Sequence, residues 1–164
     1  AINYLRWKEI LNGDTSGRFN PENNVTRCEI VKMLCCVFDK KPNENGEQVF
    51  FDVEPGMWFF GYVNTAAKLN LVLGDENQNF NPEQNVTRED LAVIIHRFCE
   101  NGNIKLEGSE LNFLDNADIA EYAKEAVDAL SAAGIISGNE NSNFMPLSEC
   151  TRAETAKIIY LLFY

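Results

Sequence analysis

Three arginines with the same surroundings are the side chains of this sequence best suited to hold an anion. Arg27, Arg88 and Arg152 each directly follow a threonine that begins a predicted helix. A cation at that position opposes the positive end of the helix dipole and needs a compensating partner. That partner is either an acidic side chain from another part of the chain, such as Asp52 or Asp115, or an external carboxylate held by the guanidinium together with free helix amides. The sequence leaves both alternatives open.

Two aromatic residues at predicted helix starts are candidates for contacts with the same ligand. Trp58 and Tyr122 each offer a flat apolar face that can stack on a sugar ring. The alternative, equally open at this point, is that both rings pack against the helices of the protein.

The remaining candidate motifs are typical of structural roles and not of metal binding or catalysis. Two runs have the start of a calcium loop, namely Asp75-x-Asn77-x-Asn79 and Asn139-x-Asn141-x-Asn143. Their sixth position is phenylalanine instead of glycine and their twelfth lacks glutamate, so we interpret them as turn residues. No motif of a hydrolase or nucleotide-binding enzyme occurs, and His96 has no partner at metal-ligand spacing. We therefore predict no metal, no cofactor and no enzymatic activity.

The composition excludes two further classes of function. Fourteen Lys and Arg oppose 25 Asp and Glu, a formal net charge of −11, whereas a nucleic-acid-binding surface must be basic to neutralise phosphates. No stretch reaches the roughly 18 to 20 apolar residues of a membrane-spanning helix. The five cysteines follow no disulfide or zinc-binding spacing, so we expect them to be small buried side chains.

The strongest pattern in the chain is an internal repeat. A segment that begins with glycine and ends with Phe-x-Pro occurs three times, and four residues separate each copy from a Thr-Arg pair. The copies are Gly13 to Pro21 with Thr26-Arg27, Gly74 to Pro82 with Thr87-Arg88, and Gly138 to Pro146 with Thr151-Arg152. Such periodicity indicates a protein built from stacked units.

Each repeat is predicted to contain two helices. The threonine caps one helix, and apolar residues recur 5, 7, 8 and 11 positions later, the spacing of a helix packed on a core. Another helix precedes each glycine-rich loop, over about residues 2–11, 58–70 and 120–133. The predicted fold class is all-α, with three helix–loop–helix repeats at residues 1–42, 43–106 and 107–164 that together form one compact domain.

These motifs resemble the S-layer homology domain, whose repeat reads Phe-x-Asp, an aromatic helix start, Gly, Phe-x-Pro and Thr-Arg-Ala-Glu. The third repeat is the most similar, with Phe113-x-Asp115, Gly138, Phe144-x-Pro146 and Thr151-Arg152-Ala153-Glu154. The second repeat keeps Phe50-x-Asp52, Trp58, Gly74, Phe80-x-Pro82 and Thr87-Arg88. The first repeat lacks the Phe-x-Asp pair and the helix-start aromatic and is therefore incomplete at its N-terminus.

The resemblance implies a non-catalytic module on the extracellular surface of a bacterium. Such domains usually come in threes and pack as a pseudo-threefold spindle around a central helical bundle. They anchor proteins to secondary cell-wall polysaccharide, often through a pyruvylated amino sugar held in grooves between repeats. The matching site residues here are Arg27, Arg88, Arg152, Trp58, Tyr122, Gly74, Gly138, Asp52 and Asp115. The alternative function is a structural module that binds protein partners in a surface layer through the same fold.

We expect the three arginines to contribute unequally. Arg88 and Arg152 should bind the anionic sugar, and Arg27 should contribute less, because its own repeat lacks the entry segment that would help to form a groove. With a protein charge of −11, recognition must act at short range, so binding should depend only modestly on salt.

Removal of divalent metal ions should leave the fold unchanged. Because the loops lack the glycine and glutamate of a calcium site, we expect the same melting temperature with and without EDTA, measured by circular dichroism. A large drop of the melting temperature in EDTA would show that these loops bind metal.

Overall fold

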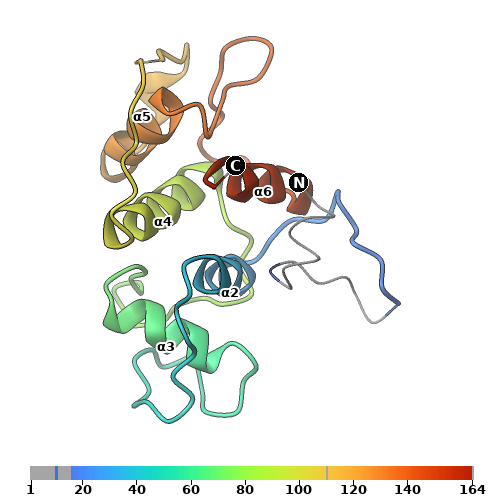
Figure 1. Cartoon of the computed structure of the whole chain (residues 1–164), viewed down its shortest axis with the longest axis vertical. Helices are drawn as coiled ribbons and strands as arrows, with labels where there is room; N and C mark the ends of the chain where they lie inside the picture. Colours follow the sequence, from blue (N-terminus) through green and yellow to red (C-terminus); the bar gives the residue numbers. More distant parts are fainter. Residues whose placement is uncertain (1–9, 11–15, 110, 164) are drawn as a thin grey trace.

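The regular elements of this protein are helices. The computed structural model describes residues 10, 16–109 and 111–163, and within them it contains no strand. The helices are α2 (Arg27–Val37), α3 (Phe60–Lys68), α4 (Arg88–Asn101), α5 (Lys124–Ala132) and α6 (Arg152–Leu161), with the short 3₁₀ helices η1 (Asn116–Asp118) and η2 (Glu121–Ala123) (Figure 1). The predicted all-α class is confirmed. The helix predicted over residues 2–11 lies, apart from Ile10, outside the described residues.

Threonine residues fix where α2, α4 and α6 begin. Thr26, Thr87 and Thr151 are the N-cap residues of these helices, as predicted. In α6 the Thr151 hydroxyl accepts a hydrogen bond from the Glu154 amide at 3.2 Å, and the Glu154 carboxylate accepts one from the Thr151 amide at 2.8 Å. This reciprocal pair satisfies two backbone donors that the start of a helix leaves without a helical acceptor.

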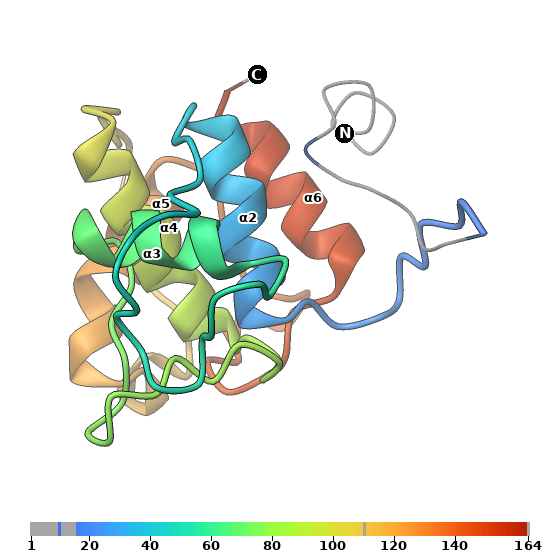
Figure 2. The same cartoon turned by 90° about the horizontal axis from the view of Figure 1, so that it is seen from below.

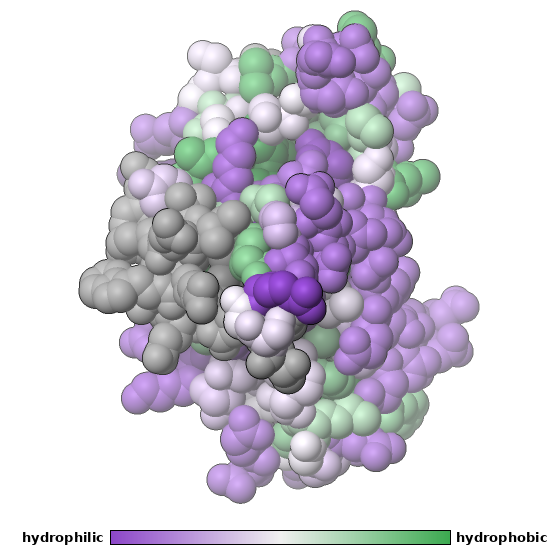
Figure 3. Space-filling model, turned by 90° about the vertical axis from the view of Figure 1, so that its right-hand side faces the viewer, coloured by the Kyte–Doolittle hydropathy of each residue, from purple (hydrophilic) through white to green (hydrophobic). Residues whose placement is uncertain are grey.

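The helices pack in pairs and bury their apolar faces. α2 packs on α3, α4 packs on α5, and α2 also contacts α4. Figures 1 and 2 both place α6 beside α2. Of the residues predicted from the helical spacing after each threonine, Val37 is only half-buried. The others are buried, among them Val31, Leu34, Ala92, Ile95, Phe98, Ala156 and Ile159. The face drawn in Figure 3 is largely hydrophilic, with small apolar areas between polar side chains.

A closed ring of backbone hydrogen bonds joins the three repeats immediately before α2, α4 and α6. The Val25 amide donates to the Cys150 carbonyl at 2.9 Å, the Cys150 amide to Val86 at 3.1 Å, and the Val86 amide back to Val25 at 3.0 Å. All three residues are fully buried, so this ring satisfies donors that water cannot reach. The overall spindle shape stays a prediction, but the ring shows that the repeats contact one another in cyclic order.

The phenylalanines of two Phe-x-Pro loops lie buried beneath these helix starts. Phe80 and Phe144 are 0% and 1% exposed. Each ring packs against the phenylalanine of its own Phe-x-Asp motif. The centroid distances are 5.5 Å between Phe50 and Phe80, which are stacked, and 5.3 Å between Phe113 and Phe144, which are tilted. Aromatic pairs at such distances stabilise a fold beyond the area that they bury.

Replacing Phe144 by alanine should destabilise the protein by about 3 kcal/mol, because the change removes a fully buried ring and leaves a cavity. Leu114→Ala is the control, since Leu114 is 81% exposed and its truncation should change stability by less than about 0.5 kcal/mol. Equilibrium urea unfolding measures both variants. A Phe144→Ala protein that unfolds with the wild type would show that this ring contributes little to the core.

Candidate functional site

Each motif arginine reaches across a repeat boundary and lies over the loop phenylalanine of another repeat. The guanidinium carbon lies 4.9 Å from the ring centre for Arg27 over Phe80, 4.9 Å for Arg88 over Phe144, and 5.0 Å for Arg152 over Phe19. These are distances at which a cation is attracted by the face of an aromatic ring. The contacts run from repeat 1 to 2, from 2 to 3 and from 3 to 1, and so link the same pairs of repeats as the backbone ring.

Backbone carbonyl oxygens orient two of the three guanidinium groups. Arg27 donates from Nε to the Phe80 carbonyl at 2.9 Å and from Nη2 to the Leu73 carbonyl at 3.3 Å. Arg88 donates from Nε to the Phe144 carbonyl at 2.7 Å and from Nη2 to the Ser137 carbonyl at 2.9 Å. Burial lowers the pKa of Arg27 below its ordinary value, but a guanidinium remains charged at neutral pH. Because a carbonyl group has no net charge, these hydrogen bonds do not neutralise the positive charges of Arg27 and Arg88.

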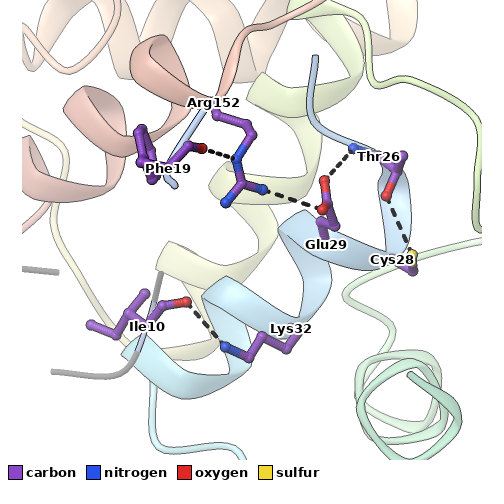
Figure 4. A network of polar contacts seen from close by, with 7 residues as sticks. All are labelled: Ile10, Phe19, Thr26, Cys28, Glu29, Lys32 and Arg152. Atoms are coloured by element: carbon purple, nitrogen blue, oxygen red, sulfur yellow. Dashed lines mark hydrogen bonds and ion pairs between the residues drawn. The ribbon is translucent and has the colours of Figure 1, made fainter. Parts of the chain in front are cut away.

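Arg152 has a different partner. Its Nε donates to the Phe19 carbonyl at 3.0 Å, and its Nη1 lies 3.2 Å from a carboxylate oxygen of Glu29 (Figure 4). An acidic partner across a repeat boundary was one of the two alternatives for these arginines. For Arg152 that partner is Glu29, whereas sequence reasoning named Asp52 and Asp115.

The helix-start amides are already bonded, so the second alternative, an anion held by free helix amides, is wrong. The first two amides of each helix donate to carbonyl oxygens in the loop of another repeat: Arg27 to Gln84, Cys28 to Pro82, Arg88 to Ser148, Glu89 to Pro146, Arg152 to Asn23 and Ala153 to Pro21, at 2.8 to 3.1 Å. These bonds satisfy donors that a helix start leaves open. An anion beside these arginines would therefore have to be held mainly by side chains.

Asp52 and Asp115 hold the Phe-x-Pro loops of their own repeats. Their carboxylates accept hydrogen bonds from two successive backbone amides each, at 2.7 Å throughout: Phe80 and Asn81 for Asp52, and Phe144 and Met145 for Asp115. The structure thus gives both residues a role in shaping the loop. A direct contact of either carboxylate with ligand stays a prediction.

Gly74 and Gly138 lie where a side chain has no room. A Cβ atom at Gly74 would come within 2.8 Å of the Phe50 ring, and one at Gly138 within 3.0 Å of the Asn143 carbonyl oxygen. Both distances are shorter than normal carbon contacts, so the glycines allow each loop to pack on its Phe-x-Asp motif. Their predicted part in ligand binding is untested.

The two runs with calcium-like spacing form local turns, which confirms the structural interpretation. The Oδ1 atoms of Asp75 and Asn139 each accept two backbone hydrogen bonds, from Asn77 and Asn79 and from Asn141 and Asn143. The side-chain oxygens that a calcium site would use as ligands thus shape the loops.

Three grooves lie beside the arginines. Groove A has a volume of about 400 Å³ and is lined by Arg152, Phe19, Glu29, Lys32 and Trp58 among others. Groove B, of about 270 Å³, is lined by Arg27, Gly74, Asp90, Arg97 and Tyr122 among others. Groove C, of about 250 Å³, is lined by Arg88, Gly138, Glu154 and Lys157 among others. Grooves A and B each combine residues from all three repeats, a composition that sequence reasoning did not foresee.

The aromatic candidates line grooves A and B. Trp58 is 56% exposed and Tyr122 is 60% exposed, so both rings offer surface to a ligand. The Tyr122 hydroxyl donates to the Asp90 carboxylate at 2.9 Å. Burial and this hydrogen bond raise the pKa of Tyr122 above its ordinary value, so the hydroxyl stays protonated at neutral pH.

A second cation lines each groove, and sequence reasoning missed all three. Lys32, Arg97 and Lys157 lie on α2, α4 and α6, the helices that wall grooves A, B and C. The available signal was their spacing: Lys32 and Lys157 follow the capping threonine by six residues, and Arg97 lies one helical turn further along the same face. Six of the 14 basic residues of the chain thus line the three grooves.

The cysteines were expected to be small buried side chains without disulfide bonds. All five cysteines are free thiols, and Cys28, Cys35, Cys99 and Cys150 are buried, as expected. Burial raises the pKa of the Cys150 thiol to about 12, which keeps it protonated at neutral pH.

In the part of the chain that the structure describes, no helix combines the length and the apolar character that a membrane span needs.

Comparison with known proteins gives one family and several large relatives. The sequence pattern of the S-layer homology domain matches residues 1–30, 50–92 and 112–156, one segment in each predicted repeat. Similar proteins are the exoglucanase XynX of Acetivibrio thermocellus (33% identical over 98% of this chain), the cellulosome-anchoring protein of the same species (27% over 92%) and the S-layer protein of Bacillus thuringiensis subsp. finitimus (24% over 97%). The chain spans only 15%, 34% and 19% of the lengths of these relatives.

Replacing Asp115 by asparagine should destabilise the protein by about 2 kcal/mol, because the new amide nitrogen cannot accept one of the two backbone hydrogen bonds. Asp118→Asn makes the same chemical change at an exposed residue and should unfold like the wild type. Equilibrium urea unfolding compares the two. Equal stability of both variants would show that the loop does not depend on the Asp115 carboxylate.

Proposed function

This chain belongs to the S-layer homology domain family, and from this membership and the groove geometry we propose that it anchors an extracellular protein by binding an anionic cell-wall polysaccharide. Its relatives include a cellulosome-anchoring protein and an S-layer protein, in agreement with a place at the cell surface. The alignment with the exoglucanase covers 98% of this chain but only 15% of the enzyme. A segment shared by an enzyme and by surface proteins supports a role in attachment and not in catalysis.

The observation that carries the proposal is the pairing of cations in the grooves. Each groove brings together one arginine from a helix start and one basic residue from a neighbouring helix, in a chain whose net charge is −11. The whole molecule repels anions, so a ligand must be attracted over a short distance by these pairs. A concave site lined by two cations, with an aromatic wall in grooves A and B, suits an acidic sugar.

A pyruvylated amino sugar fits the grooves better than a plain carboxylate does. Its carboxylate can be held by the guanidinium and the second basic side chain, and the apolar face of its ring can stack on Trp58 or Tyr122. Both aromatic side chains are more than half exposed within their grooves. The ligand would thus contact all three repeats at once in grooves A and B.

The geometry gives Arg27 a larger part than the sequence suggested. Arg27 was ranked last because its own repeat lacks an entry segment, but it lines groove B, whose loop belongs to repeat 2 and whose aromatic residue belongs to repeat 3. The missing segment of repeat 1 is therefore no reason for weak binding at Arg27. We propose that Arg27 and Arg88 contribute to a similar degree.

Removing the second cation of a groove should weaken binding without breaking the hydrogen bonds of the motif arginines. We expect Arg97→Gln and Lys157→Gln each to reduce affinity for purified secondary wall polysaccharide by about two- to fivefold, the range of a partly exposed charge pair. Arg88→Lys should weaken binding more, because lysine cannot offer a planar fork to a carboxylate. Calorimetry measures the affinities, and circular dichroism checks that each variant folds.

Lys68→Gln is the matched control, since Lys68 is exposed and lies outside the grooves. It should bind like the wild type. A pull-down on wall sacculi, before and after removal of their secondary polysaccharide, tests the proposal as a whole. Retention that does not depend on the polysaccharide would contradict it and would favour a module that binds protein partners.

A further inference from the structure

The third residue of α2, α4 and α6 is acidic, and this carboxylate has a different main partner in each groove. In groove A Glu29 pairs with Arg152 at 3.2 Å. In groove B the equivalent Asp90 accepts the hydroxyl proton of Tyr122 at 2.9 Å. In groove C Glu154 bonds the amide and hydroxyl of its own cap, Thr151, at 2.8 and 2.9 Å.

Only one groove arginine among the described residues is thereby neutralised. The ion pairs found in that part of the chain include Arg152 but neither Arg27 nor Arg88, whose hydrogen bonds all go to carbonyl oxygens. The Arg152–Glu29 pair is also well sheltered, since the two side chains are 11% and 32% exposed. A charge pair with this little exposure is screened less by salt than one at the surface.

Figure 4 shows how the pair is placed in groove A. The guanidinium of Arg152 lies between the Phe19 carbonyl and the Glu29 carboxylate, and the same glutamate bonds the Thr26 amide through its second oxygen, at 3.1 Å. Lys32, one turn along α2, donates to the Ile10 carbonyl at 3.2 Å. Glu29 is therefore anchored at both oxygens, which holds its negative charge against Arg152.

We infer, on the basis of the proposed function, that Glu29 is an internal competitor for the ligand in groove A. Its carboxylate occupies an edge of the Arg152 guanidinium and must move aside or share it when the carboxylate of an acidic sugar binds. The ion pair thus lowers the preference of groove A for acidic sugars below the preference that Arg152 and Lys32 alone would give it. The selectivity of this groove depends more on the contact between the sugar ring and Trp58.

Two substitutions separate the pairing of Glu29 from its charge. Glu29→Gln removes the charge, and glutamine can still accept the Thr26 amide as in other capping boxes. Glu29→Asp keeps the charge but shortens the side chain, and Asp90 shows that aspartate at this position lies too far from its arginine, Arg27, to form an ion pair. Both variants should remove the ion pair with Arg152, and Asp90 in α4 shows that a helix start of this fold accommodates aspartate at this position.

Binding in groove A can be followed through one tryptophan. The chain has two, and a Trp7→Phe background leaves the fluorescence of Trp58, a groove A residue, as the reporter. The probes are a pyruvylated N-acetylhexosamine and its methyl ester, which has the same ring without the negative charge. We expect Glu29→Gln to tighten binding of the acid by about threefold or more, Glu29→Asp to tighten it less, and the ester to bind all three proteins alike.

Glu149→Gln controls for the change in net charge. Glu149 bonds Asn24, a wall residue of groove A, but makes no ion pair with Arg152, so its loss should alter the affinity for the acid by less than about twofold. If Glu29→Gln binds the acid like the wild type, or gains no more than Glu149→Gln, the inference is wrong while the proposed function stands. If neither the wild type nor any variant binds the acid, both are overturned.

Discussion

A guanidinium held over a phenylalanine of another repeat is the interaction on which the rest of this structure depends. The arginine is the first residue of its helix, where a cation opposes the helix dipole, and in Arg27 burial disfavours the charge further. Carbonyl oxygens and a ring face from the neighbouring loop offset both effects. Because the compensation comes from another repeat, each helix start is stable only when the next loop is in place.

The same constraint explains why the grooves exist. The helix-start amides and the arginine tie one helix to a loop of another repeat, and the Phe-x-Asp aspartate ties that loop to its own entry segment. The surface between these fixed points is concave and lined by the arginine, so the residues that join the repeats also supply charge for a ligand. A mutation of a motif arginine therefore changes stability and binding together, whereas Arg97 and Lys157 separate the two.

Periodicity located the helices and the core because both depend on local spacing, which a single sequence contains. The partners of Arg27 and Arg88 could not be predicted in this way, since the backbone carbonyls of Phe80 and Phe144 leave no mark in the sequence. For the same reason the helix amides looked available to an anion. The composition of the grooves was missed in part because each combines side chains that are distant in sequence, such as Trp58 with Arg152.

Small differences between the repeats then produce unequal grooves on a cyclic scaffold. Tyr122 has a hydroxyl that donates to Asp90, and this shorter carboxylate forms no ion pair with Arg27 among the described residues. Trp58 has no hydroxyl, and in its groove the longer Glu29 extends to Arg152 instead. The aromatic residue of one repeat thus influences whether the arginine of a second repeat is neutralised by the acid of a third. Three copies of one motif can in this way hold sites of different charge without any change in the contacts that join the repeats.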